Sequence, residues 1–218
     1  KGKVEIKDIK ENYILFAEDI SYFKNDEKIF TKGKTSAKIQ SKYEILSENL
    51  TFLVDKKVLN SSNKTKIIKE KTQIIHLNKF ELHLDEEQLK GENIIVINNF
   101  GLPKSDKLYF SSAIINLKND SFVAKDTEIK IHKEIFNNSN NDPRIKGVSA
   151  TGNNDLTTLN KAIFTSCKIN DDCPPWSISA KSIKHEKKKK QITYDGAILR
   201  IYDFPVLYFP KFFHPDPT

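Results

Sequence analysis

The residue types best suited to chemistry in this chain are its only two cysteines, Cys167 and Cys173. A zinc site normally takes four closely spaced Cys or His ligands, and thioredoxin-like redox chemistry takes a CxxC motif beside a βαβ unit. The sequence around this pair offers neither pattern. Two cysteines on one turn can reach bonding distance, and Pro174 and Pro175 would stiffen the chain that follows Cys173. The pair therefore favours a disulfide, which is expected in an exported protein.

Signals of catalysis are weak in the rest of the chain. It contains no GxGxxG, Walker or GxSxG motif, and none of its five histidines has HExxH spacing. His83 and His132 alternate with apolar residues, which predicts solvent-facing positions on strands. Adjacent carboxylates such as Glu86 and Glu87 fall in turn sequences, where acidic residues are common. We therefore expect a protein that is not an enzyme and holds no metal or cofactor.

The net charge of +7 comes almost entirely from lysine, since Arg144 and Arg200 are the only arginines. Sequence-specific reading of nucleic acid relies mainly on bidentate arginine contacts, so we expect no nucleic-acid partner. A lysine-rich surface fits solubility or diffuse attraction to anionic lipids and phosphates. The segment "HEKKKKQ" (185–191) could bind phosphate groups, but a solvated hairpin turn is the favoured interpretation.

Both ends of the sequence are abrupt. The chain has no methionine and begins at Lys1 without an apolar segment, which favours an exported chain whose signal peptide has been removed. It stops within the aromatic, proline-rich stretch "VLYFPKFFHPDPT", which is typical of the middle of a polypeptide. No stretch approaches the roughly 18 apolar residues of a membrane helix. We expect a piece of a larger protein.

Hydrophobic residues recur with a period of two in stretches such as "QIIHL", "KFELHL", "NIIVI" and "WSISA", separated by polar turn clusters. This pattern predicts an all-β fold. Residues 137–158 form the longest stretch poor in apolar residues and are predicted to be a long loop or linker. We expect one continuous domain, with a repeat-built body over 1–158 and the last hairpins over 159–218.

An internal repeat aligns "AEDISYF" (17–23), "SENLTFL" (47–53) and "LNKFELH" (77–83), with Ile20, Leu50 and Phe80 thirty residues apart. Repeated β units of this kind predict stacked sheets. The first apolar residue of each unit, together with Tyr22, Phe52 or Leu82, would face inward. Alternation alone does not distinguish a filled core from an open groove.

Residues 160–218 carry a series of motifs that resembles one known family. The series consists of Thr165-Ser166-Cys167, a Trp-x-Ile-x-Ala strand beginning at Trp176, a charged hairpin, "DFPVLYFP" (203–210) and "HPDP" (214–217). These motifs are similar to the end of the periplasmic domain of the LptD family of lipopolysaccharide-assembly proteins, also called organic solvent tolerance protein (OstA). Over 1–158 only the repeat pattern resembles the family's OstA-type units.

The resemblance implies a β-jellyroll of two facing sheets around an open hydrophobic groove that carries the acyl chains of lipid A. It also implies a location at the periplasmic side of the outer membrane of a Gram-negative bacterium. Family members use a cysteine at the position of Cys167 for a bridge to their β-barrel. A local Cys167–Cys173 bridge and a bridge to barrel cysteines therefore both stay open.

On this view the domain receives lipopolysaccharide from an LptA-like periplasmic jellyroll bridge protein by strand addition. It then passes the lipid to its own C-terminal β-barrel, which holds an LptE-like plug lipoprotein. The alternatives are a free-standing periplasmic bridge or anchor of the same fold, a carbohydrate-active β-protein and a structural surface β-protein. The residues predicted to line the lipid groove are Phe16, Ile20, Tyr22, Leu50, Phe52, Ile75, Phe80, Leu82, Ile115, Leu117, Phe164, Trp176 and Ile178. The predicted docking edge is Val4, Ile6 and Ile9, and the predicted barrel-proximal residues are Pro205, Tyr208, Pro210 and Pro215.

Overall fold

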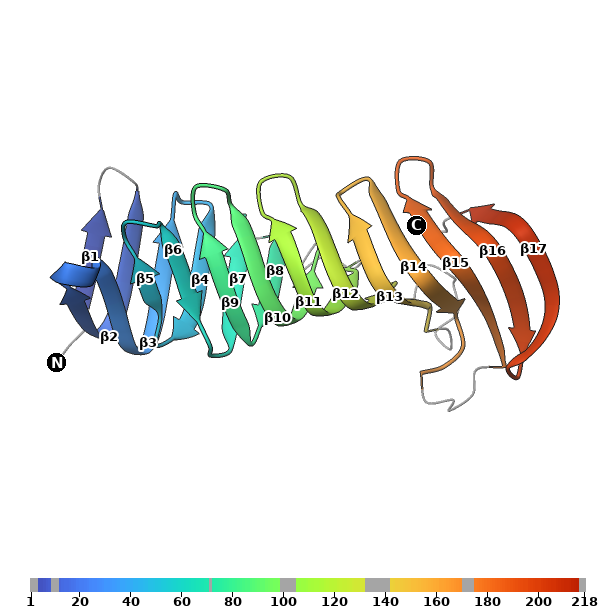
Figure 1. Ribbon diagram of the computed structural model, residues 1–218, viewed down its shortest axis with the longest axis horizontal. Coiled ribbons are helices and arrows are strands. Elements are labelled where there is room, and N and C mark those ends of the chain that lie inside the picture. The colour runs from blue at the N-terminus through green and yellow to red at the C-terminus, as the bar shows by residue number, and fades with distance from the viewer. Residues whose placement is uncertain are drawn as a thin grey trace. The chain divides into compact units, whose positions relative to one another are not determined.

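A computed structural model describes residues 4–8, 12–70, 72–98, 105–131, 142–169 and 175–215. These residues form seventeen β-strands and one short 3-10 helix, η1 (Lys24–Asp26), which confirms the all-β prediction (Figure 1). The chain divides into two compact units, Lys1–Leu102 and Pro103–Thr218, called here the N-terminal and C-terminal units.

Ten strands belong to the N-terminal unit, and seven belong to the C-terminal unit. The first ten are β1 (Val4–Asp8), β2 (Tyr13–Phe23), β3 (Lys28–Ile39), β4 (Tyr43–Glu48), β5 (Thr51–Leu53), β6 (Val58–Ser61), β7 (Thr65–Lys69), β8 (Gln73–Leu77), β9 (Lys79–His83) and β10 (Gln88–Ile97). The last seven are β11 (Lys107–Asn116), β12 (Ser121–Lys130), β13 (Arg144–Gly152), β14 (Leu156–Thr165), β15 (Trp176–Glu186), β16 (Gln191–Ile201) and β17 (Phe204–Pro215).

Eight strands of the N-terminal unit close into an antiparallel ring. One half of β3 pairs with β5 and the other half pairs with β4, while β10 pairs in the same way with β9 and β8. The hydrogen-bonded order is therefore β3–β4–β7–β8–β10–β9–β6–β5 and back to β3. Gly33 lies between the two halves of β3 at a φ of +78°, a conformation that glycine adopts without strain. β2 pairs with the other edge of β3, and β1 pairs with β2.

The thirty-residue repeat is confirmed as a stack of strands. Register partners link Tyr22 to Ile29, Ile29 to Phe52, Phe52 to Leu59 and Leu59 to Leu82, so residues thirty apart share one transverse row. Phe52 and Leu82 are buried, but Tyr22 is 57% exposed. The reason is that β1 pairs only with the first half of β2, so the second half has a described partner, β3, on one side only.

The inward position predicted for Phe16 is wrong. Its register partner is Ser36 on the outer face, whereas the neighbouring Leu15 pairs with the buried Ala37. A β-bulge between Ala17 and Asp19 shifts the register. Such a bulge exchanges the two faces of the strand, so residues that are in phase in the sequence lie on opposite sides.

The C-terminal unit is an antiparallel meander in which each strand from β11 to β17 pairs with the next (Figure 1). Within the predicted loop at 137–158, residues 144–152 form strand β13 and β14 begins at Leu156. Ile145 and Ala150 of β13 are buried, but most of their neighbours are polar. The apolar residues were therefore too few for alternation to predict a strand here. The expected division after residue 158 falls inside β14, which pairs on both sides and so belongs to one sheet.

Candidate functional site: the apolar interiors

The interior of the N-terminal unit is filled by side chains. Two inner rows, each with one residue per strand, face the inside of the ring, and every member is 7% exposed or less. The groove candidates Leu50, Phe52, Ile75, Phe80 and Leu82 are all buried here, whereas Ile20 is half-buried. The rows are Ala37–Ile45–Ile67–Ile75–Val96 and Ile29–Phe52–Leu59–Leu82–Leu89, and Leu15 continues the first row onto β2, beside the ring.

The space left between these side chains is small. A gap of about 10 Å³ lies among Tyr13, Leu15, Phe52 and their neighbours. A single water molecule needs roughly 10–15 Å³ of such space, so this gap does not admit an acyl chain. Any lipid inside the unit would require the inner rows to move apart.

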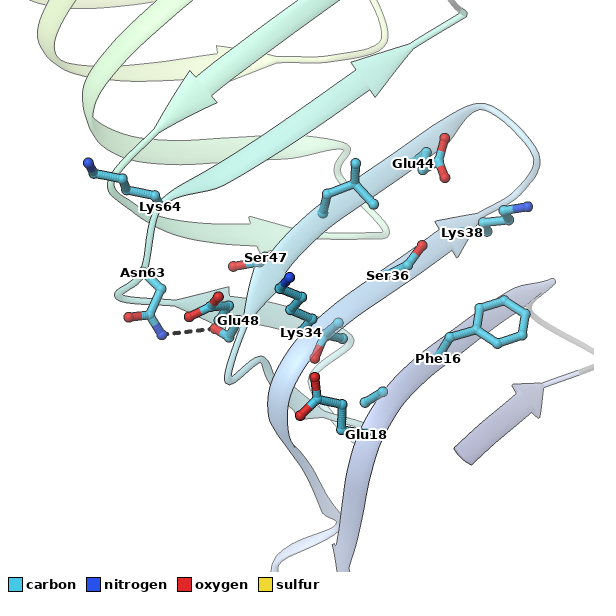
Figure 2. A pocket seen from close by; sticks show the side chains of 13 residues that line it. Phe16, Glu18, Lys34, Ser36, Lys38, Glu44, Ser47, Glu48, Asn63 and Lys64 are labelled. Carbon is cyan, nitrogen blue, oxygen red and sulfur yellow. Dashed lines mark hydrogen bonds between the residues drawn. The ribbon is translucent and has the colours of Figure 1, made fainter. Parts of the chain in front are cut away.

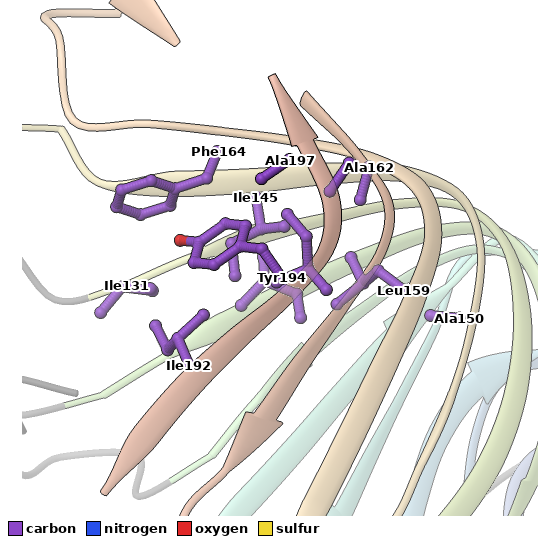
Figure 3. Packing of buried hydrophobic residues seen from close by; sticks show 12 residues of the cluster. Ile131, Ile145, Ala150, Leu159, Ala162, Phe164, Ile192, Tyr194 and Ala197 are labelled. Atoms are coloured by element: carbon purple, nitrogen blue, oxygen red, sulfur yellow. The ribbon is translucent and has the colours of Figure 1, made fainter. Parts of the chain in front are cut away.

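A second apolar cluster lines the inner face of the C-terminal unit (Figure 3). One row across its strands runs Ala124–Ala150–Leu159–Ile183–Tyr194, and all five side chains are 2% exposed or less. Of the groove candidates in this unit, Ile115, Leu117 and Phe164 are buried. Trp176 and Ile178 are partly buried and pack against the cluster.

Phe164 shows that the sheet of the C-terminal unit folds over its own inner face. His214 shares a transverse row with Thr157, which lies seven residues before Phe164 on β14. On a straight strand those seven residues would span about 23 Å. The ring centroids of Phe164 and His214 are nevertheless 5.8 Å apart, and those of Phe164 and Tyr194 are 6.3 Å apart. Figure 3 shows Phe164 and Tyr194 facing one another.

A hydrogen-bond chain joins Tyr194 to the last described strand. His214 Nδ1 lies 2.7 Å from the Pro215 carbonyl oxygen, which can only accept, so this nitrogen carries the proton. The other ring nitrogen, Nε2, then accepts from the Tyr194 hydroxyl at 2.9 Å. Burial raises the pKa of Tyr194 well above its ordinary value, which keeps the hydroxyl protonated. Sequence reasoning did not assign Tyr194 to any site and placed His214 only in the HPDP motif, although Ile192 and Tyr194 alternate as inward-facing residues do.

The cysteine segment is held by a buried arginine. Arg144 is 8% exposed, and its Nη1 donates to the carbonyl oxygens of Cys167 at 2.6 Å and Asp142 at 3.0 Å. The Sγ of Cys167 lies 3.6 Å from the Trp176 carbonyl oxygen, and no described residue forms a disulfide with it. Cys173 lies outside the described residues, so the pairing of the two cysteines stays a prediction.

Replacing Arg144 with alanine should destabilise the C-terminal unit by about 1.5–3 kcal/mol, because hydrogen bonds from a charged donor are lost and two carbonyl groups are left without it. The reaction of the Cys167 thiol with a chromogenic disulfide should also become faster, since its segment is no longer held. Urea unfolding and thiol kinetics measure the two effects. Arg144→Lys keeps the charge but not the planar set of donors. Its stability and thiol reactivity should therefore lie between those of the parent and those of Arg144→Ala. Unchanged stability and thiol reactivity in Arg144→Ala would rule out this role.

The outer face of the N-terminal unit carries a hollow of about 1110 Å³ over β2, β3 and β4 (Figure 2). Phe16 lies at this hollow, together with lysines and glutamates. The charges are balanced across the strands, because Lys34 is the register partner of Glu48 and Lys38 that of Glu44. Among the described residues, the hollow is therefore lined by three lysines and three glutamates.

The two predicted edge motifs lie on terminal strands. Val4 and Ile6 are on β1, whose only described partner is β2, while Ile9 lies outside the described residues. The barrel-proximal residues are on β17, whose only described partner is β16. Nearly all of β17 is exposed, and Phe204 is 77% exposed. The barrel-proximal residues on this strand are Pro205, Tyr208, Pro210 and Pro215.

Polar candidates away from the interior have structural explanations. Residues 187–190 form the turn between β15 and β16, and Lys188 pairs with Asp155 at 2.7 Å, as the hairpin interpretation predicts. His83 bonds the Glu81 carboxylate at 2.6 Å and lowers the pKa of Glu81. His132 lies outside the described residues. Among the residues that the structure describes, no cluster of His, Cys, Asp and Glu could hold a metal ion.

No helix in the described part of the chain is long and apolar enough to cross a membrane. No protein-family model matches the sequence, and no curated protein matches it.

Proposed function

We propose that this chain is a lipopolysaccharide-transport domain of the LptD type, a conduit rather than an enzyme. The observation that carries the proposal is the continuity of the apolar inner rows, which place one apolar residue on each successive strand in both units. Such a row offers an acyl chain the same apolar surface at every step across the strands. The motifs of residues 160–218 add the family resemblance to this physical argument.

Transfer of acyl chains into this interior is favourable by roughly 0.8 kcal/mol per CH₂ relative to water. The side chains fill the interior in the absence of lipid, so the open groove of a β-jellyroll is proposed as the lipid-bearing form. The β1 edge would receive the bridge protein by strand addition, which supplies backbone hydrogen bonds without a specific pocket. Lipopolysaccharide would leave toward the barrel at the β17 end.

Photo-crosslinking tests the proposal with a matched pair of isoleucines. Ile178 lies on β15 against the inner cluster, and Ile163 lies on the neighbouring β14 with its side chain 48% exposed. Benzoylphenylalanine placed at residue 178 should crosslink purified lipopolysaccharide after irradiation, and the same group at residue 163 should not, because only the first faces the interior. The product is read as a shifted band on an immunoblot.

Equal crosslinking at the two positions would mean that the lipid lies on the surface, and absence of crosslinking at both would refute the conduit. Crosslinking by a soluble oligosaccharide without acyl chains, at residue 178 only, would favour the carbohydrate-active alternative.

A further inference from the structure

Five aromatic side chains gather where the two ends of the C-terminal sheet's inner face meet. We call them the aromatic clasp: Phe164, Trp176, Tyr194, Phe212 and His214. Phe164 contacts Trp176 at a centroid distance of 5.8 Å, and Tyr194 contacts Phe212 at 5.7 Å and His214 at 5.5 Å. These rings come from the four consecutive strands β14 to β17.

The two sides of the clasp are held differently. Phe164 is 3% exposed and lies on β14, which pairs with strands on both sides. His214 is half-buried and lies on β17, which among the described strands pairs only with β16. β17 also contains three prolines, which have no N–H donor, and its ladder with β16 has a register shift at Leu199/Arg200. Opening would therefore move β17 while Phe164 stays in place.

The apolar cluster behind the clasp is filled, and Leu159 and Ile183 are fully buried. An acyl chain can reach these residues only when the folded sheet opens. We propose that the aromatic clasp is the gate of this interior, which acyl chains pass when β17, carrying Phe212 and His214, moves away from Phe164. This inference rests on the proposed function and adds how its lipid site is regulated.

The aromatic clasp is held closed by a few weak contacts rather than by an extensive packed core. Ring contacts and one hydrogen bond each contribute modestly, so opening is a local event of low cost compared with unfolding. Loss of the His214 ring should therefore raise the opening rate by about tenfold, as expected for loss of one hydrogen bond and its ring contacts. Phe213, the neighbour of His214, points to the outer face and is 63% exposed, which makes it a matched control.

The test measures uptake of cis-parinaric acid, a fluorescent fatty acid, by the full chain with both native cysteines replaced by serine. His214→Ala should take up the probe about tenfold faster than its parent, as expected for the lost hydrogen bond and ring contacts, and Phe213→Ala should not differ from the parent. In a second variant, cysteines replace Phe164 and His214 and are joined by a bifunctional thiol reagent. Uptake should then fall below that of the parent, and it should exceed that of the parent when the reagent is omitted. A Phe164→Cys/Phe213→Cys pair should show no slowing by the reagent.

The outcomes separate the two proposals. Suppose that the parent takes up the probe, and that the Phe164→Cys/His214→Cys protein takes it up at the same rate with and without the reagent. The gate is then refuted and the conduit survives. If no variant takes up the probe, the interior does not bind acyl chains and both proposals fail. Circular dichroism of each variant establishes that the fold is kept, and His214→Ala supplies the answer if the double-cysteine protein does not fold.

Discussion

Phe80→Asp is expected to unfold the N-terminal unit. Phe80 is 3% exposed within the closed ring, where its register partners are Ser61 on β6 and Gly91 on β10. An aspartate there would bury an unpaired carboxylate, and a cavity would replace the ring. The combined cost is several kcal/mol, comparable to the roughly 5–15 kcal/mol that stabilises a whole domain. Loss of the far-ultraviolet β signal at 25 °C measures the effect.

The matched control is Glu81→Asp, because Glu81 is the next residue on β9 and its side chain lies on the other face. The Glu81 side chain is 47% exposed and its contacts with His83 and Lys90 lie at the surface, so the shorter aspartate should change stability by no more than about 1 kcal/mol. A folded Phe80→Asp protein would contradict the filled ring. It would mean that water or a ligand already has access to this face, as in an open groove.

The stacking of the repeat could be predicted from the sequence because it depends only on spacing. Tyr22, Phe52 and Leu82 recur at a fixed interval on strands with a side-chain period of two, so they return to one face and one row. The faces themselves were less predictable. One inserted residue at the Ala17–Asp19 bulge reverses the alternation, and the residue types there do not indicate a bulge. Phe16 was therefore assigned to the wrong face.

The aromatic clasp could not be predicted from the sequence for a different reason. Alternation indicates that Phe164 and Tyr194 point inward, but not that the two ends of the inner face meet. That contact depends on bends in several strands together, such as the one at Gly196, where φ is +61°. A glycine in a strand interior marks a possible bend. It does not say which side chains the bend brings into contact.

Two substitutions of Tyr194 separate the contribution of ring packing to the stability of the C-terminal unit from that of the hydrogen bond. Tyr194→Ala should destabilise this unit by about 3–5 kcal/mol, because a fully buried aromatic side chain is replaced by a cavity between Phe164 and Phe212. Tyr194→Phe keeps the ring and loses only the hydroxyl. It should cost about 0.5–1.5 kcal/mol, toward the lower end, since water can replace the lost donor at the half-buried His214.

Urea unfolding of both variants, followed by circular dichroism, gives the two free energies. A large ratio between them means that ring packing holds the folded sheet closed, and the hydrogen bond then serves mainly to orient His214 at the clasp. Equal losses in the two variants would contradict this division. They would assign the closure to the Tyr194–His214 hydrogen bond, and His214→Ala should then be as destabilising as either change at Tyr194.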